Sequence, residues 1–302
     1  MLDPIYICGP TASGKSSLAI ELARINDGEI VNADAYQLYQ GLEIISAAPN
    51  KAELEQAPHH LYGVLQPNQL CDAMQFREMA LEKIKEIQSR GKLAIITGGS
   101  GLYLKFLSHG PSPVPSSDES LRNELENESD EALIERLTQL DPEGAEATNL
   151  KNRRYVIRAL EICILSGSKM SEVKNDWKNK NKKVEAGLRG AYLQWDRDQL
   201  RERINHRVGQ MLKDGAVEEV AALKTPSTTC KKAIGIPQLY SYLEGDINIE
   251  ECRERIAAAT RQYAKRQRTW FGKENWLTPC PVDELADMQK LASKISRKLC
   301  PG

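Results

Sequence analysis

The sequence contains no apolar run of membrane-spanning length and no Cys-X-X-Cys pair. The first absence excludes a membrane-spanning helix. The seven cysteines are scattered along the chain, so we expect neither a disulfide framework nor a zinc site, and this usage is typical of a reducing compartment. We therefore expect a cytoplasmic globular protein with no membrane partner and, because no extended apolar seam is visible, a monomer.

An excess of charge of one sign is also missing, since 41 basic and 42 acidic residues give a net charge of −1 over 302 residues. The whole molecule is therefore not a polycation, and only local patches could bind a polyanion. Such patches exist: residues 111–150 hold eleven acidic and two basic residues, whereas 151–183 hold ten basic and three acidic ones. The length allows a full core and two lobes.

Residues 9–16 read Gly-Pro-Thr-Ala-Ser-Gly-Lys-Ser and match the phosphate-loop pattern. An apolar strand is predicted before them at 5–8, and a helix is predicted from Ser16 onward. This order places backbone N–H groups and the positive end of a helix around one anion. Lys15 would reach a terminal phosphate, and the Ser16 hydroxyl would hold Mg²⁺. The loop does not identify the molecule that carries the phosphate.

Strands and helices alternate along the first part of the chain, which predicts a parallel α/β sheet of the P-loop NTPase type. Further strands are predicted at 28–32, 93–97 and 188–194, with helices at 76–89, from 102, and at 197–213, 217–223 and 249–270. Residues 50–76 are expected to be irregular.

Three prolines at 111, 113 and 115 predict a hinge into an all-helical insertion. Within the insertion we expect helices at 118–127, 130–140 and 152–166 and a Lys/Asn-rich loop at 175–183. Residues 1–110 and 188–302 would then form the catalytic core with its C-terminal helices. Residues 111–187 would form the helical domain.

Asp34 follows the predicted strand 28–32, at the sheet edge where the phosphate loop also lies. Its carboxylate could act as a general base, bind Mg²⁺ or cap a helix. Strand 93–97 ends in a second glycine loop, Gly98-Gly99-Ser100-Gly101, and not in the acid that orients water in phosphate-loop ATPases. This loop either lines the same crevice or is an ordinary helix start.

Two predicted helices carry arginines at regular spacing. Arg203 and Arg207 share one face, which suits a pyrophosphate, unless the helix is merely solvated and laced by Asp198 and Glu202. The helix at 249–270 has a basic stripe that could bind a nucleic-acid backbone or simply face water. That stripe consists of Arg261, Lys265 and Arg268, and a separate apolar stripe consists of Ile256, Ala259, Tyr263 and Trp270.

Two adjacent histidines, His59 and His60, raise the question of a metal site. No third ligand lies at a useful spacing from them in the sequence. We therefore expect a hydrogen-bonded loop pair.

Motifs along nearly the whole chain resemble the tRNA dimethylallyltransferases, also called tRNA isopentenyltransferases. The segment 260–271, Thr-Arg-Gln-Tyr-Ala-Lys-Arg-Gln-Arg-Thr-Trp-Phe, is very specific to that family, whereas the phosphate loop alone is not. The other segments that carry the resemblance are 32–34, 39–44, 98–103, 158–161, 197–198 and 233–235.

The resemblance implies transfer of a dimethylallyl group from its diphosphate to the exocyclic N6 amine of the adenosine 3′ of the anticodon in tRNA, without ATP. Asp34 would be the general base. The groups around the diphosphate would be Gly9, Pro10, Thr11, Ala12, Ser13, Gly14, Lys15, Ser16 and Arg207, with Mg²⁺ as cofactor. The tRNA anticodon stem-loop would contact Asp34, Ala35, Tyr36, Gln37, Ser100, Arg122, Arg154, Tyr155, Arg158, Lys232 and Gly235, besides the basic stripe.

The chain departs from the family pattern at several tRNA-contacting stretches: at Ala35, Ala48, Tyr155 and Pro237. Two other functions stay open. A small-molecule phosphate-loop kinase would turn over ATP, and an RNA-binding module would have lost its chemistry. The presence of Lys15, Ser16, Asp34 and Arg207 together argues against the second.

Overall fold

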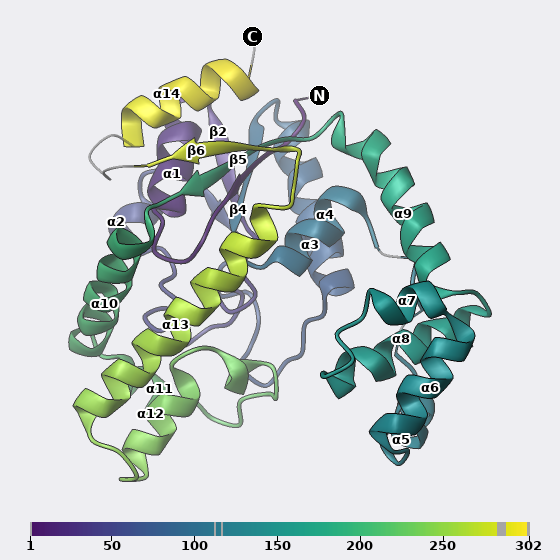
Figure 1. Ribbon diagram of the computed structural model, residues 1–302. Coiled ribbons are helices and arrows are strands. Elements are labelled where there is room, and N and C mark those ends of the chain that lie inside the picture. The colour runs from purple at the N-terminus through teal and green to yellow at the C-terminus, as the bar shows by residue number, and fades with distance from the viewer. Residues whose placement is uncertain (1, 112, 116, 283–287, 301–302) are drawn as a thin grey trace. The chain divides into compact units, whose positions relative to one another are not determined.

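The computed structural model describes residues 2–111, 113–115, 117–282 and 288–300 (Figure 1). The chain divides into two compact units, one formed by Met1–Ser108 with Leu188–Gly302 and the other by His109–Gly187. In the described part of the chain, no helix has the length and apolar character needed to cross a bilayer. The seven cysteines are free, and six of them are buried.

The larger unit contains a six-stranded sheet with the strand order β3-β2-β4-β1-β5-β6. Every pair of neighbouring strands is parallel, so the predicted parallel α/β fold is confirmed. Three strands, β1, β2 and β4, are buried along their whole length; β1 and β4 are mostly apolar, as expected of such strands, whereas β2 also buries Glu29 and Asn32. The strands are β1 Ile5–Cys8, β2 Gly28–Asn32, β3 His59–His60, β4 Leu93–Gly98, β5 Arg189–Gln194 and β6 Leu277–Pro281.

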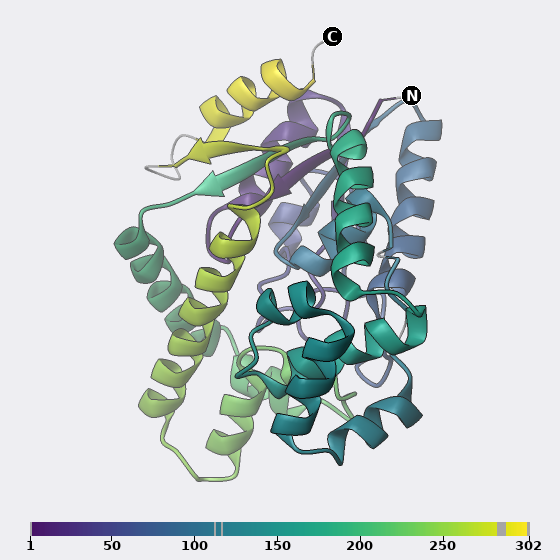
Figure 2. The same cartoon turned by 45° about the vertical axis from the view of Figure 1, so that its right-hand side comes forward.

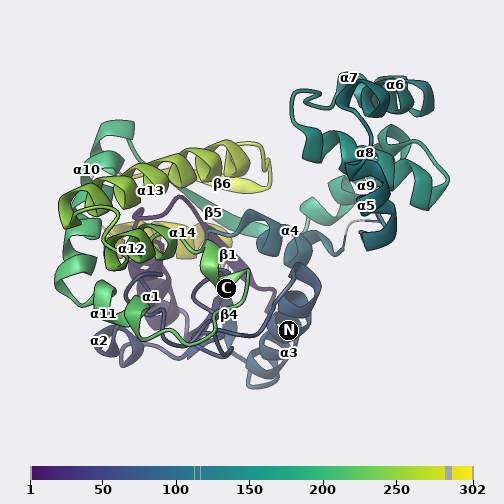
Figure 3. The same ribbon diagram turned by 90° about the horizontal axis from the view of Figure 1, so that it is seen from below.

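Helices cover both faces of this sheet. Along β1, Ile5 and Ile7 pack in one hydrophobic cluster with Leu18 of α1, whereas Tyr6 packs in another with Phe76 of α3. This division follows from the alternation of side chains along a strand. Helix α14 lies beside α1 (Figure 1), and α13 lies beside α10 and α12 (Figure 3). The helices are α1 Lys15–Ile25, α2 Lys51–Leu54, α3 Ala73–Ser89, α4 Gly101–His109, α10 Arg197–Lys213, α11 Ala216–Ala221, α12 Ile236–Leu243, α13 Ile249–Phe271 and α14 Met288–Leu299, with a 3₁₀ turn at Cys230–Lys232.

The edge strand β6 pairs with β5 and was not predicted from the sequence (Figure 2). Its sequence, Leu-Thr-Pro-Cys-Pro, holds two prolines in five residues. Proline cannot donate to a neighbouring strand, so it is normally found at a sheet edge. Pro279 and Pro281 lie at such an edge, because β6 is the last strand in the order.

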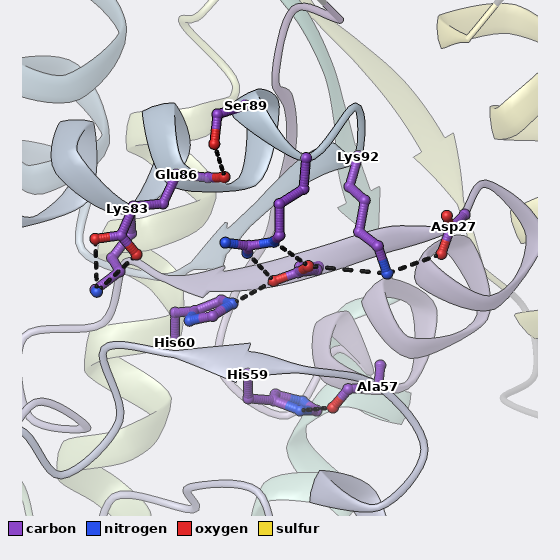
Figure 4. Close-up of polar contacts among 10 residues, drawn as sticks. Asp27, Ala57, His59, His60, Lys83, Glu86, Ser89 and Lys92 are labelled. Atoms are coloured by element: carbon purple, nitrogen blue, oxygen red, sulfur yellow. Dashed lines mark hydrogen bonds and ion pairs between the residues drawn. The ribbon is translucent and has the colours of Figure 1, made fainter.

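The prediction of an irregular segment at 50–76 was wrong in part, although most of the segment has no regular structure. It contains α2 and β3, and α3 begins at Ala73 because Asp72 caps its first turn together with Gln75. The histidine pair forms β3 itself and is not a loop: His60 Nε2 lies 2.7 Å from a carboxylate oxygen of Glu29, and His59 Nδ1 lies 2.7 Å from the carbonyl oxygen of Ala57 (Figure 4). Both rings therefore have hydrogen-bond partners.

The smaller unit is helical, and its predicted loop at 175–183 is in fact part of helix α9. Met170 and Asn181 are buried and Trp177 is half-buried, so one face of α9 packs although lysines dominate the rest. Lysine is a good helix former, and composition alone does not reveal that face. The helices of this unit are α5 Glu119–Glu126, α6 Asp130–Leu140, α7 Pro142–Glu146, α8 Arg153–Ser166 and α9 Met170–Glu185.

A pair of glycine substitutions tests the packing at the end of β4. A Cβ atom at Gly98 would lie 2.8 Å from Cα of Ala33 and even closer to its carbonyl group, so Gly98→Ala should lower the free energy of unfolding by about 2–3 kcal/mol. A Cβ atom at Gly209 of α10 would have no neighbouring atom within 4 Å, so Gly209→Ala should raise it by about 0.5–1 kcal/mol. Urea unfolding monitored by tryptophan fluorescence measures both, and equal midpoints would contradict this packing.

Candidate active site

Four neighbouring strands end at the same edge of the sheet, in the order β2-β4-β1-β5. The segments that follow them are the turn with Asp34, the second glycine loop, the phosphate loop and the stretch that begins with Trp195. In open parallel sheets, ligands bind outside the carboxyl ends of the strands. The topology therefore brings the residues singled out in the sequence to one edge.

The phosphate loop leads directly into α1, whose N-cap is Gly14 with φ 87°. This left-handed conformation is readily adopted by glycine. No side chain caps this helix start, so the first-turn amides are available for an anion. Trp195, which follows β5, fixes the loop through a hydrogen bond: its Nε1 donates to the Ser13 carbonyl oxygen at 2.8 Å.

Two arginines of α10 reach the phosphate loop from the side. Arg203 Nε donates to the Ala12 carbonyl at 2.8 Å, and its guanidinium lies 4.6 Å from the centre of the Trp195 ring. Arg207 donates to the hydroxyl of Thr11. Among the residues that the structure describes, the buried Nε of Arg207 has no hydrogen-bond partner. The interpretation of this face as merely solvated is therefore wrong.

Removal from water lowers the pKa of both cations at the loop. Lys15 donates from Nζ to the Pro10 carbonyl at 2.8 Å, and burial lowers its pKa to about 8, although Asp34 opposes the shift. Burial likewise lowers the pKa of Arg207 to about 10. Each cation would gain from an anion that replaces the water it has lost.

Asp34 lies in a tight turn after β2, where the Asn32 side chain accepts from the Asp34 amide at 2.8 Å and donates to its carbonyl at 3.1 Å. The carboxylate accepts from the Tyr36 amide at 3.1 Å. No helix begins here, so the helix-cap interpretation is wrong. Burial raises the pKa of Asp34, while the Tyr36 amide and then the Lys15 and Arg207 cations oppose that rise.

The second glycine loop packs directly against the Asp34 turn. Ser100 Oγ accepts from the Ala35 amide at 2.9 Å, and a Cβ atom on Gly99 would lie 3.5 Å from Oδ2 of Asp34. The loop therefore packs against the turn that carries the carboxylate, besides beginning helix α4.

Several residues predicted to contact tRNA lie together in the larger unit. Besides the link from Ser100 to Ala35, the Tyr36 hydroxyl donates to the Lys232 carbonyl at 3.2 Å. Gln37 donates to the Ala47 carbonyl at 2.8 Å, so its amide is used within the protein. Gly235 begins α12, on the same stretch as Lys232.

On α13, the basic stripe is divided. Lys265 and Arg268 are exposed, whereas Arg261 is bound to Glu254 at 2.6 Å and to Asn205 at 2.8 Å. The predicted apolar stripe is wrong at Trp270, which is 41% exposed, whereas Ile256 is buried and Ala259 and Tyr263 are half-buried. The buried face instead includes two polar residues, Thr260 and Gln267, whose side chains bond within the fold.

In the smaller unit, four predicted tRNA contacts line one groove of about 620 Å³, namely Arg122, Arg154, Tyr155 and Arg158. Arg122 and Arg158 both donate to the fully buried carboxylate of Glu161, at 2.9 and 3.1 Å. Tyr155 is 58% exposed. The groove therefore combines oriented guanidinium groups with an accessible ring.

Sequence reasoning missed Trp195, Tyr263 and Gln267, which hold the loops of this site. Tyr263 and Gln267 are four residues apart on one side of α13, and both donate to the Gly99 carbonyl. Two signals in the sequence point to Gln267: it lies in the family-specific segment 260–271, and it falls in helical register with the buried Ala264 and Phe271.

Comparison with known proteins gives consistent matches over the whole chain. A family model described as IPP transferase matches residues 37–274. A tRNA dimethylallyltransferase of Akkermansia muciniphila is 44% identical over 295 residues, which cover 98% of this chain and 99% of that protein. One from Geobacter sulfurreducens is 40% identical over 278 residues, covering 89% of each chain.

Solved structures agree in fold over nearly the whole of this chain. The full-length tRNA isopentenylpyrophosphate transferase of Bacillus halodurans superposes with a TM-score of 0.70 at 32% identity, covering 99% of this chain and 97% of that one. A eukaryotic dimethylallyltransferase acting on tRNA gives a TM-score of 0.79 at 28% identity, covering 97% of this chain and 77% of the other.

The lowered pKa of Lys15 predicts how anion affinity depends on pH. The protonated amine attracts an anion, so affinity for inorganic pyrophosphate should fall as the pH rises through about 8, by roughly tenfold at pH 9. Isothermal titration from pH 7 to 9 measures this change. In Lys15→Arg the guanidinium stays charged over this pH range. Pyrophosphate itself also titrates, and dividing the dissociation constant of the original chain by that of Lys15→Arg at each pH cancels this contribution. A ratio that is independent of pH would contradict the prediction.

Proposed function

The chain belongs to the IPP transferase family, whose curated members are named tRNA dimethylallyltransferases, and we propose that it transfers a dimethylallyl group from dimethylallyl diphosphate to tRNA. The acceptor is the exocyclic N6 amine of the adenosine 3′ of the anticodon, and the product is N6-isopentenyladenosine. The observation that supports this reaction best is the arrangement of two partly buried cations, Lys15 and Arg207, at a phosphate loop beside the carboxylate of Asp34.

The chemistry requires a base and a stabilised leaving group. An aromatic amine is a poor nucleophile, so Asp34 accepts its proton as the bond forms between the amine nitrogen and the allylic carbon. The bond from that carbon to the diphosphate oxygen breaks, and pyrophosphate leaves. Lys15, Arg207 and the loop amides stabilise the charge that develops on it. The burial of Asp34 makes it a stronger base than an exposed carboxylate.

A magnesium ion fits this site through Ser16, the second residue of α1, which is half-buried. Mg²⁺ takes oxygen ligands, keeps several waters and commonly binds one or two protein groups together with phosphate oxygens. Ser16 would supply such a hydroxyl. When bound, the ion would help to neutralise the departing diphosphate. In this proposal the phosphate loop binds the diphosphate of the donor, and the reaction consumes no nucleotide.

The RNA must deliver its target base to the edge of the sheet. Bases that enzymes modify are taken out of the stack, and single-stranded loops allow this readily. The anticodon stem-loop would contact the Asp34 turn, Ser100 and the 3₁₀ turn with Lys232 in the larger unit. It would also contact the basic stripe of α13 and, in the smaller unit, the groove lined by Arg122, Arg154, Tyr155 and Arg158.

A single incubation tests the reaction. The protein is mixed with radiolabelled dimethylallyl diphosphate, Mg²⁺ and unmodified tRNA, and ATP is omitted. We expect label in the RNA, at the adenosine 3′ of the anticodon. Unlabelled RNA together with consumption of ATP in a parallel reaction would instead support the phosphate-loop kinase.

Replacement of the base tests the role of Asp34. Asp34→Asn removes the proton acceptor with little change in size, so the transfer rate should fall by about 10²–10⁴-fold while tRNA affinity stays within about twofold. Single-turnover kinetics and filter binding measure the two quantities. Asp246→Asn, at an exposed position far along the chain, is the matched control. Unchanged turnover in Asp34→Asn would exclude this residue as the base.

Charge removal on α13 tests the RNA surface. Lys265→Gln with Arg268→Gln removes two exposed cations and leaves the bound Arg261 in place. The slope of log affinity for tRNA against log salt should decrease in magnitude by about 1.5, because each lost phosphate contact removes about 0.7–0.9. Filter binding between 50 and 200 mM salt measures the slope. If the slope does not change, this face of α13 is simply solvated.

A further inference from the structure

Gln267 of α13 connects two loops that lie far apart in the sequence. Its side chain is 4% exposed. Oε1 accepts from the backbone amide of Thr11 at 2.8 Å, and Nε2 donates to the backbone carbonyl of Gly99 at 2.9 Å. One amide group therefore holds both the phosphate loop and the second glycine loop.

The bridge needs a neutral side chain that accepts and donates at the same time. Glutamine offers both functions at its end, whereas an ionised glutamate only accepts, lysine only donates and methionine does neither strongly. Losing the bridge would remove the acceptor of the Thr11 amide and would leave the Gly99 carbonyl with the Tyr263 hydroxyl as its remaining side-chain donor. The buried neighbours Ala264 and Phe271 fix the position of α13 itself.

Each end of the bridge lies next to a group of the proposed reaction. The hydroxyl of Thr11 accepts from Arg207, and the carbonyl of the adjacent Ala12 accepts from Arg203. At the other end, a Cβ atom on Gly99 would lie 3.5 Å from Asp34 Oδ2 and would clash with Nε2 of Gln267. The bridge thus spans from the loop that would hold the leaving group to the loop that packs on the base.

We propose that Gln267 is a positioning residue that sets the distance between the phosphate loop and the Asp34 carboxylate. The inference rests on the proposed function, because the reaction needs the leaving group and the base at fixed places around one carbon. Misplacement of reacting groups by about 1 Å can cost about 10²-fold in rate. The residue acts through Thr11 and Gly99 and touches neither substrate.

Tyr263 provides an internal comparison, because it lies one turn earlier on α13 and touches only one of the loops. Its hydroxyl donates to the same Gly99 carbonyl at 3.2 Å. Tyr263→Phe therefore removes one of two donors to Gly99 and leaves the Thr11 contact intact. Its effect should be smaller than that of a change at Gln267.

The experiment compares Gln267→Met, Gln267→Asn and Tyr263→Phe with a matched control, Gln289→Met, at an exposed position of α14. For Gln267→Met we expect kcat for dimethylallyl transfer to fall about 100-fold and the dissociation constant of inorganic pyrophosphate to rise about tenfold. The dissociation constant of tRNA should stay within twofold. Gln267→Asn keeps both functions on a shorter chain and should be intermediate. Tyr263→Phe should lose less than tenfold in kcat, and Gln289→Met should match the unmodified protein.

Two results would overturn the inference. One is a folded Gln267→Met protein whose kcat and pyrophosphate affinity stay within threefold of the unmodified chain. The other is a loss of kcat that tracks tRNA affinity and the folded fraction measured by circular dichroism. If Gln267→Met does not fold, kcat, pyrophosphate affinity and tRNA affinity are compared in Gln267→Asn instead. Absence of transfer by the unmodified protein would reject the proposed function instead, and pyrophosphate binding would then decide the role of Gln267.

Discussion

Two cations and one carboxylate share a partly buried edge of the sheet, and the proposed chemistry depends on their balance. Burial lowers the pKa of Lys15 and of Arg207 and raises that of Asp34, while the opposite charges limit these shifts. A diphosphate in the loop would neutralise the two cations. Their positive charge would then oppose the rise in the pKa of Asp34 less strongly. In the reaction proposed above, binding of the donor would in this way make Asp34 a stronger base for the second substrate.

The parts of this site that could be predicted from the sequence depend on local order. The strand, phosphate loop and helix are contiguous, Asp34 directly follows a strand, and Arg203 and Arg207 are one helical turn apart. The parts that could not be predicted depend on distant partners. Gln267 meets Thr11 and Gly99, which are 256 and 168 residues away, and nothing in the local pattern distinguishes a bridging glutamine from a solvated one.

Secondary structure follows the same division. The buried strands β1 and β4 were predicted because they are mostly apolar, and β2 was predicted around its central Ile30 and Val31. Strand β3 has two residues and exists because it pairs with β2, where Glu29 also binds the second histidine. Helix α9 was predicted as a loop because its buried face is narrow and lysine and asparagine dominate its composition.

The smaller unit shows how a few buried acids organise a charged surface. Glu161 is fully buried and accepts from Arg122, Arg158 and the Ser117 hydroxyl. These donors hold its pKa below the usual range despite the effect of burial. A buried carboxylate with such partners fixes the directions of two guanidinium groups that would otherwise move freely. The side chains that line the groove are therefore oriented by contacts within the protein itself.

The two edge strands of the sheet, β3 and β6, affect how readily the protein aggregates in concentrated solution. An open strand edge can pair with the edge of another molecule and start aggregation. Here one edge is the two-residue β3, and the other is β6, where Pro279 and Pro281 supply no amide hydrogen. Neither edge offers a long row of donors to a neighbouring chain. The prolines that hid this strand in the sequence thus help to keep each molecule separate from its copies.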